Sequence, residues 1–168
     1  MSKFEIRKAT INDIPLIRDL CFQVWPQTYS SIVSQEQIDY MLDKMYSRES
    51  LQKQMDTASQ YIIVYEDSEA VGFAAYFEMS QSVFKLDKIY VLLSQQGKGT
   101  GRFMIDYIVN TIKQKGGTAL QLQVNRYNKA KNFYEKLGFV VIDEKDFDIG
   151  NGFFMNDYVM EKQLAEGS

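Results

Sequence analysis

The chain has 168 residues and a mass of 19.5 kDa, the size of a single domain. Its residues are 45% hydrophobic, which excludes a disordered chain, and its net charge of −3 argues against a protein that binds the phosphate backbone of a nucleic acid. It contains no histidine and one cysteine, Cys21, which excludes His-based nucleophile systems, His-ligated zinc, internal disulfides and multi-cysteine metal sites.

Neither the N-terminal segment nor any other stretch carries a targeting or membrane signal. No apolar run approaches the ~18–20 residues that cross a bilayer, and a lone thiol fits a reducing compartment. We therefore expect a cytoplasmic protein with no membrane or nucleic-acid partner. The absence of repeats and linkers predicts one domain over residues 1–164, followed by a frayed tail at 165–168.

The first half of the chain predicts one strand, two or three helices and then three strands. Alternating apolar and polar residues predict a strand at Phe4–Lys8. Thr10 and Asp13 form a capping box that starts the first helix, Ser34 caps a second, and Ser50–Met55 forms a short third. Antiparallel strands follow at Tyr61–Tyr65, Val71–Phe77 and Phe84–Leu93.

The second half alternates helices and strands. Apolar residues from Phe103 to Ile112 mark a long amphipathic helix, which ends near Lys115 and two glycines. Further elements are expected as a strand at Ala119–Val124, a helix at Ala130–Leu137, and strands at Phe139–Ile142 and Phe153–Met160. This order predicts an α/β (α+β) fold with a mixed, mostly antiparallel seven-stranded sheet and helices on both faces.

A glycine-rich turn joins the third of the three consecutive strands to the long helix. Glycines at 97, 99 and 101 allow backbone N–H groups to converge on an anion at the helix N-terminus, and Lys98 and Arg102 add positive charge. The spacing matches neither the P-loop nor the dinucleotide-binding fingerprint. A tight turn with no ligand remains the alternative.

Two segments together resemble the GNAT N-acyltransferase family. Gln96-x-x-Gly99-x-Gly101, which follows the strand residues 89–91, is similar to the pyrophosphate loop of that family. The sequence VNRYNKAKNFYEKLGF at residues 124–139 resembles its second cofactor motif. Both segments stand in the family's order and spacing, and the expected elements match the fold over essentially the whole chain. The resemblance implies a GNAT fold and an acetyl-CoA-dependent N-acetyltransferase.

The same resemblance assigns cofactor contacts. The backbone of Ile89, Tyr90 and Val91 would pair with the pantetheine arm, and Asn128 would contact the cofactor through its side chain, with Asn125 nearby. The pyrophosphate would be held by Gln96, Gly97, Lys98, Gly99, Thr100, Gly101 and Arg102.

Tyr134 stands where the family often places the general acid that protonates the departing thiolate. A phenol with a pKa of about 10 can donate that proton without losing it in the resting enzyme. The alternatives are a ring packed within the helix for Tyr134 and a plain helix cap for Asn128.

An amine acceptor arrives as an ammonium ion and must lose a proton before it attacks the thioester. Without histidine, a carboxylate acting through water is the natural base. Asp87 lies where similar polyamine acetyltransferases carry an acid, and Glu78 is the second candidate; a salt bridge from Asp87 to Lys85 or Lys88 is the alternative. Cys21 lacks an activating base, so we expect direct transfer in a ternary complex without a metal.

The expected acceptor segments, residues 25–47 and 143–160, resemble the polyamine-acetylating PaiA-like branch of the family. A cationic aliphatic amine would be held by charge and cation–π contacts. The residues predicted to contact it are Tyr29, Glu36, Asp39, Tyr40 and Asp157. Further acidic and aromatic residues of these segments are Asp43, Tyr46, Asp143, Glu144, Asp146 and Asp148.

Three alternatives stay open at this point. The acids can be solvated surface residues. The acceptor can instead be a protein N-terminus, a lysine, an amino acid or an aminoglycoside. In a different class of function, the chain can be a non-catalytic CoA-binding regulatory module. A homodimer is compatible with the sequence.

Overall fold

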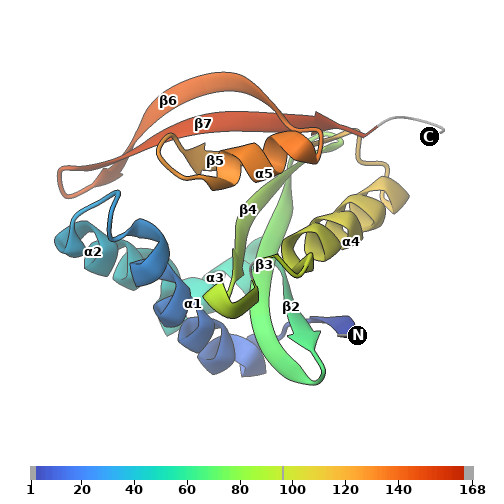
Figure 1. Cartoon of the computed structure of the whole chain (residues 1–168), viewed down its shortest axis with the longest axis horizontal. Helices are drawn as coiled ribbons and strands as arrows, with labels where there is room; N and C mark the ends of the chain where they lie inside the picture. Colours follow the sequence, from blue (N-terminus) through green and yellow to red (C-terminus); the bar gives the residue numbers. More distant parts are fainter. Residues whose placement is uncertain (1–2, 96, 165–168) are drawn as a thin grey trace. The chain divides into compact units, whose positions relative to one another are not determined.

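The computed structural model describes residues 3–95 and 97–164 (Figure 1). These residues form two compact units, one made of Met1–Phe77 with Lys88–Ile108 and the other of Glu78–Asp87 with Val109–Ser168. The prediction of one domain over 1–164 stays a prediction, and the tail expected at 165–168 lies outside the described residues.

Most elements begin where the sequence predicts. Thr10 and Asp13 form the expected capping box, in which the Asp13 carboxylate accepts from the Thr10 backbone N–H at 2.8 Å. Ser34 caps the second helix as expected. The third helix is longer than expected because Ser47 caps it instead. The elements up to this point are β1 (Phe4–Lys8), a 3-10 turn (Ile11–Asp13), α1 (Ile14–Tyr29), α2 (Gln35–Tyr46) and α3 (Arg48–Thr57).

The rest of the chain follows the predicted order with one correction. The remaining elements are β2 (Gln60–Glu66), β3 (Glu69–Ser80), β4 (Val83–Val91), a 3-10 turn (Leu93–Gln95), α4 (Thr100–Gln114), β5 (Ala119–Asn125), α5 (Ala130–Lys136), β6 (Val140–Gly150) and β7 (Phe153–Gln163). The strand expected to end at Ile142 continues to Gly150, so its acidic part is strand and not connecting loop. β6 is an edge strand and largely exposed, so it shows no apolar alternation.

The seven strands lie in the order β1-β2-β3-β4-β5-β7-β6, which confirms the mixed sheet. β4 and β5 run parallel through residues 83–86 and 119–122, whereas the β1–β2, β2–β3, β5–β7 and β6–β7 pairs are antiparallel. In the first unit, helices cover both faces of the strands. Tyr46 of α2 contacts Phe73 on one face, while Phe103 of α4 contacts Phe4 on the opposite face.

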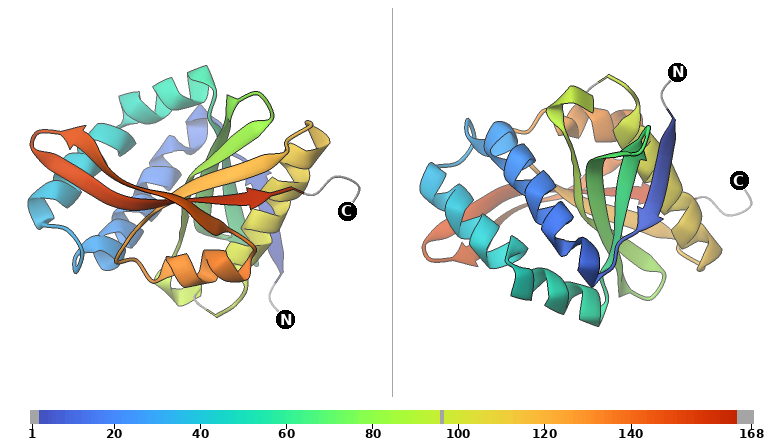
Figure 2. Two further views of the ribbon diagram at one scale, coloured as in Figure 1. Left: turned by 90° about the horizontal axis from the view of Figure 1, so that it is seen from above. Right: turned by 90° about the horizontal axis from the view of Figure 1, so that it is seen from below.

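In the second unit, β7 lies between β5 and β6 (Figure 2), and α5 packs on one face of these strands. The Lys162 ammonium donates to the Leu137 carbonyl at 2.6 Å, which ties β7 to the end of α5. On the opposite face, the Gln121 amide donates to Glu161 at 3.4 Å. Asp157 shares this second face, opposite Asn125 on β5 and Lys145 on β6.

Candidate active site

The glycine-rich turn at the start of α4 has the geometry of an anion site. β4 ends at Val91, two residues earlier than expected, and the chain turns before α4 begins at Thr100. Gly97 and Gly99 both have φ of +82°, and an added Cβ at either would meet no atom within 4 Å. The backbone conformation therefore favours glycine, and space stays open beside it. Gln96 lies outside the described residues.

The turn also has favourable electrostatics. α4 is 15 residues long, and its first N–H groups and positive dipole end point toward the turn. The side chains of Lys98 and Arg102 are 45% and 71% exposed, so both are accessible to an anion. This arrangement fits the pyrophosphate of a CoA-type cofactor.

A buried hydrogen-bond network supports this turn, and the sequence analysis missed it. Gln95 is only 4% exposed; its Oε1 accepts from the Thr100 hydroxyl at 2.8 Å, and its Nε2 donates to Glu66 at 2.9 Å. Glu66 also accepts from the Lys98 ammonium at 3.2 Å. Glu66 ends β2, 29 residues before Gln95, so only the folded chain brings them together.

The last residues of β4 pass close to β3. A Cβ on Gly72 would lie 2.6 Å from the Tyr90 carbonyl oxygen, so this position has no room for a side chain. The Tyr90 ring lies 5.7 Å from Phe73 and 6.0 Å from Trp25, and its hydroxyl lies 3.4 Å from that of Tyr29. Burial raises the pKa of Tyr90 well above its usual value. Tyr29 is a buried core residue, whereas Tyr90 is half-buried like Ile89 and Val91, with its ring packed on core aromatic residues.

Lys88 is a buried cation among aromatic rings, which the sequence did not predict. It is 5% exposed, its Nζ donates to Gln54 Oε1 at 2.8 Å, and it lies about 5.5 Å from the ring centroids of Tyr46 and Tyr61. Burial also raises the pKa of the nearby Cys21 thiol, although Lys88 opposes that shift. Cys21 is therefore a protonated core thiol and not a nucleophile.

The two carboxylates proposed as bases have different surroundings. Asp87 is half-buried, and the Lys85 ammonium lies 3.9 Å from its Oδ1, which is the ion pair considered as an alternative. Glu78 is exposed and accepts from the Ser82 backbone N–H at 3.0 Å in the β3–β4 turn. Glu78 thus stabilises a turn, and a base role for either residue stays a prediction.

Two asparagines shape the segment between β5 and α5. Asn125 is 4% exposed, and its Oδ1 accepts from the Tyr127 backbone N–H at 2.9 Å. Asn128 is half-buried, and its Oδ1 accepts from the backbone N–H of Ala130, the first residue of α5, at 2.9 Å. The N-cap of α5 is Lys129, so the plain-cap alternative for Asn128 does not hold as stated, and its cofactor role stays a prediction.

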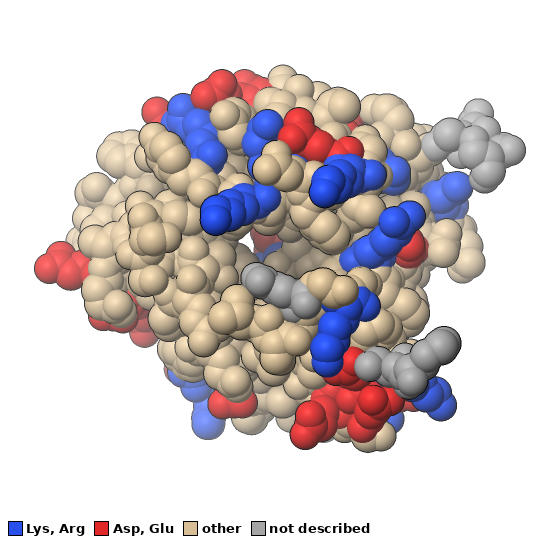
Figure 3. Space-filling view, viewed as in Figure 1, with Lys and Arg blue, Asp and Glu red and all other residues tan. Residues whose placement is uncertain are grey.

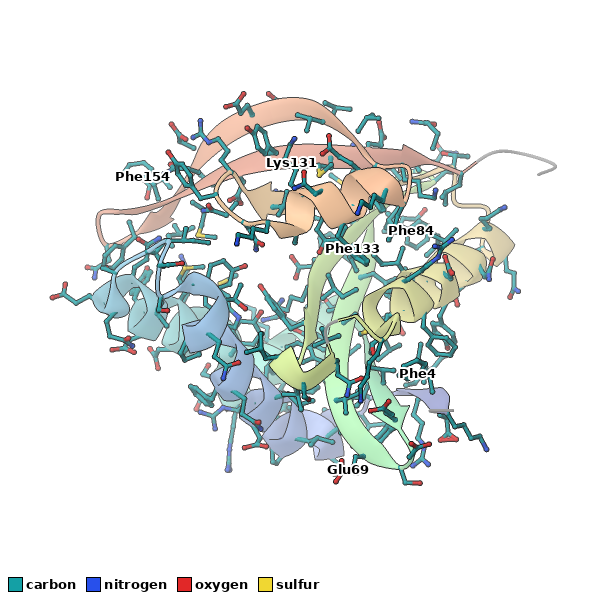
Figure 4. The ribbon with its side chains drawn as sticks, in the orientation of Figure 1. Phe4, Glu69, Phe84, Lys131, Phe133 and Phe154 are labelled. Carbon is teal, nitrogen blue, oxygen red and sulfur yellow. The ribbon has the colours of Figure 1, made fainter. Side chains whose placement is uncertain are left out.

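Tyr134 lies on α5 and is 9% exposed. Its ring packs 5.5 Å from Phe133 and 5.8 Å from Phe139, centroid to centroid. Phe133 and Lys131 lie on the same helix (Figure 4), and the Lys131 ammonium lies 5.2 Å from the Tyr158 ring centroid of β7. The packing of the Tyr134 ring matches the alternative to the acid role, but the two roles are compatible because a packed ring can still present its hydroxyl.

Asp157 is the one buried carboxylate in the described part of the chain. It is 4% exposed, and its Oδ1 has no hydrogen-bond partner among the described residues. Burial raises its pKa to about 6, against the opposing effects of Lys85 and Arg126. The Arg126 guanidinium is itself held by Glu144 and Asp146 of β6.

The residues predicted to bind the acceptor differ in burial. Tyr29 and Tyr46 are buried in the first unit's core, and Tyr40 is half-buried beside Lys44, whose ammonium lies 5.7 Å from its ring centroid. The exposed acids of both segments are Glu36, Asp39, Asp43, Asp143, Glu144, Asp146 and Asp148. These exposed acids match the solvated alternative, and Asp157 stands apart from them by its burial.

Beyond this site, the described residues offer neither a metal-binding cluster nor a membrane-spanning helix. No group of three or more His, Cys, Asp or Glu side chains within residues 3–95 and 97–164 is placed to hold a metal ion. No helix in the same ranges is long and apolar enough to cross a membrane. Both signs of charge appear on the face drawn in Figure 3.

The family follows from a comparison with known proteins. Residues 30–162 match the model of the acetyltransferase (GNAT) domain. The chain belongs to the GNAT acetyltransferase family. Acetyl-CoA is the acyl donor of GNAT enzymes, and the resemblance of the two sequence motifs to this family is thereby confirmed.

Individual GNAT relatives differ in how much of the chain they match. The spermidine N(1)-acetyltransferase of Thermoplasma acidophilum is 27% identical over 165 residues, which cover 95% of this chain and 96% of that protein. The crystal structure of the PaiA N-acetyltransferase from the same organism, in complex with coenzyme A, has a TM-score of 0.81 and covers 96% of this chain and 99% of its own. The ribosomal protein bS18-alanine N-acetyltransferase of Haemophilus influenzae is 33% identical over 81 residues, 46% of this chain and 53% of that protein.

Proposed function

We propose that the protein transfers the acetyl group of acetyl-CoA to a primary amine, and that the amine is a polyamine such as spermidine or spermine. The observation that carries the proposal is the combination of an anion-binding turn at the start of α4 with a match to a spermidine acetyltransferase over 95% of the chain. The bS18-alanine enzyme matches only 46% of it, which favours a small amine over a protein N-terminus.

Acetyl-CoA is proposed to bind through main-chain and side-chain contacts from both motifs. The turn of residues 96–102 is proposed to hold the pyrophosphate, with Lys98 and Arg102 adding charge. The main chain of residues 89–91 is proposed to pair with the pantetheine amides. Asn125 and Asn128 are proposed to contact the cofactor from the end of β5.

The proposed reaction needs an acid and a base. Tyr134 is proposed to give its phenolic proton to the departing thiolate. The base removes a proton from the acceptor ammonium, and Asp87 is the carboxylate that the family resemblance assigns to this role.

The reaction is proposed to take place in the cytoplasm, consistent with the buried free thiol of Cys21. Sedimentation velocity in solution would test the homodimer with which the sequence is compatible.

The first experiment is a thermal melt of the full chain with and without acetyl-CoA, at fixed salt and protein concentration. Acetyl-CoA at a hundred times its dissociation constant stabilises a protein by about 2.7 kcal/mol, which raises the Tm of a chain of this size by roughly 5–10 °C. Gly99→Ala provides a matched variant, because its φ of +82° is strained for alanine. We expect Gly99→Ala to need a higher acetyl-CoA concentration for the same shift.

The second experiment measures release of the CoA thiol with spermidine, spermine, monoamines, an aminoglycoside and a peptide that begins with alanine. Spermidine or spermine should give the highest kcat/KM. A preference for the alanine peptide would replace the polyamine with a protein N-terminus. A clear acetyl-CoA shift with no thiol release from any acceptor would favour the non-catalytic module.

A further inference from the structure

We propose that Asp157 is the carboxylate that receives the acceptor's ammonium group and takes its proton. This inference rests on the proposed acetyl transfer to an amine, and it identifies within that reaction a residue that the resemblance did not assign as the base. It also differs from the role of Asp87, which the family pattern suggests.

The first argument is that Asp157 Oδ1 is a buried hydrogen-bond acceptor without a donor among the described residues. Asp157 is 4% exposed, and its Oδ1 is buried without a hydrogen-bond partner among the described residues. A buried acceptor with no donor costs free energy, so native proteins rarely retain one without a ligand or a functional role. An ammonium ion carries three N–H donors and would satisfy this atom.

The second argument is the position of Asp157 in the fold. It pairs with Asn125, the last residue of β5. The Asn128 N–H donates to the Asn125 carbonyl at 3.0 Å, so the turn to α5 begins at this position, and the Asp157 side chain lies on the face of β7 opposite to α5. Asp157 therefore stands at the carboxyl end of a strand that runs parallel to β4, the edge where α/β sheets bind their ligands.

The third argument is the charge around Asp157. Lys85 of β4 and Arg126, which follows β5, are the two cations that act on it. Each cation already has an acidic neighbour: Lys85 lies 3.9 Å from Asp87, and Arg126 is bonded to two carboxylates of β6, Glu144 and Asp146. These groups with Asp157 make four carboxylates against two cations, so the cluster favours a further cation.

Lys145 of β6 is the remaining charged residue in register with Asp157, and its ammonium lies 3.4 Å from Asp143. Its charge is thus also balanced locally. Desolvation is the largest effect on Asp157 and raises its pKa to about 6, within the range in which a carboxylate can accept a proton near neutral pH.

The proton transfer balances as follows. The acceptor ammonium gives one proton to the Asp157 carboxylate, directly or through water, and the neutral amine attacks the thioester carbonyl. The new C–N bond forms, the C–S bond breaks, and the amine nitrogen loses its second proton as the amide forms. The thiolate takes its proton from Tyr134, the second amine proton restores the phenol, and Asp157 releases the first proton to solvent.

The test compares the wild-type chain with Asp157→Asn, Asp87→Asn and the control Asp56→Asn, whose carboxylate is exposed on α3. For Asp157→Asn we expect kcat/KM for spermidine to fall at least a hundredfold at pH 7, and the acid limb of its pH profile near pH 6 to disappear. The acetyl-CoA KM should stay within twofold, and Asp56→Asn should match the wild type.

A second measurement separates a base from a structural residue. The defect of Asp157→Asn should shrink as the pH approaches about 10, because an amine that is already neutral needs no base. An intact melt with a normal acetyl-CoA shift shows that the variant is folded. A fall that is equal at pH 7 and pH 10 would overturn the proposal.

The remaining outcomes are distinct. If the wild type transfers acetyl groups but Asp157→Asn keeps its activity within twofold, the assignment of Asp157 is wrong and the proposed function stands. If the acid limb of the pH profile disappears in Asp87→Asn and persists in Asp157→Asn, the assignment of Asp157 is likewise wrong and the proposed function stands. If the wild type acetylates no amine, the proposed function fails and this assignment fails with it.

Discussion

Replacing Asp157 with asparagine should stabilise the protein at neutral and alkaline pH. Burial raises the pKa of Asp157 from 3.8 to about 6, so the folded state holds its proton more tightly than the unfolded state. Its contribution to stability is therefore fully present below pH 4 and lost as pH rises through 6. A shift of about two units corresponds to at most about 3 kcal/mol, since one unit is 1.36 kcal/mol.

The assay is the difference in Tm between Asp157→Asn and the wild type from pH 4.5 to 8.5, without ligands. Each kcal/mol shifts the Tm of a chain of this length by about 2–4 °C, so we expect a gain of roughly 3–10 °C at pH 8 that fades toward pH 4.5. The new amide needs its own partners, which lowers the gain. Asp56→Asn, an exposed residue, should stay within about 0.5 kcal/mol at every pH. A variant less stable than the wild type at pH 8 would refute the reasoning.

Three further changes give independent tests. Tyr134→Phe should lower kcat at least tenfold while acetyl-CoA binding, measured by calorimetry, is unchanged; an unaltered rate would exclude the acid role. Gln95→Ala removes the hydrogen bonds to Thr100 and Glu66 and should raise the acetyl-CoA KM at least fivefold at constant kcat, so a fall in kcat alone would contradict a positioning role. Gly72→Ala places a Cβ 2.6 Å from a backbone oxygen and should cost about 1–3 kcal/mol in urea unfolding; an unchanged midpoint would show that β3 can shift.

The fold could be predicted from local patterns because its elements carry their own signals. The capping box at Thr10 and the serine cap at Ser34 set helix starts through interactions within a few residues. The second half of β6 escaped prediction because an exposed edge strand does not need apolar alternation. Strand 140–150 is instead defined by its pairing with β7, which is a long-range feature.

In the candidate site, too, some features follow from local sequence and others depend on long-range packing. The glycine-rich turn is readable from sequence, because the backbone conformation at Gly97 and Gly99 limits the residue type. The depth of Asp157 is not, since its sequence neighbours do not distinguish it from the exposed acid Asp148. Burial of a polar side chain depends on which strands flank it, and the partners of Gln95 likewise come from a distant strand.

The hydrogen bond that the Asn128 side chain accepts has a consequence for ligand binding. Its Oδ1 already accepts from the Ala130 N–H at 2.9 Å, so its amino group, which carries two donors, is the part better placed to bind a ligand, and it favours a ligand acceptor such as an amide carbonyl. Asn128→Asp would keep the oxygen that accepts from Ala130 and remove that donor. The oxygen of this side chain thus binds the first backbone N–H of α5, and its amino group can select a ligand atom that accepts a hydrogen bond.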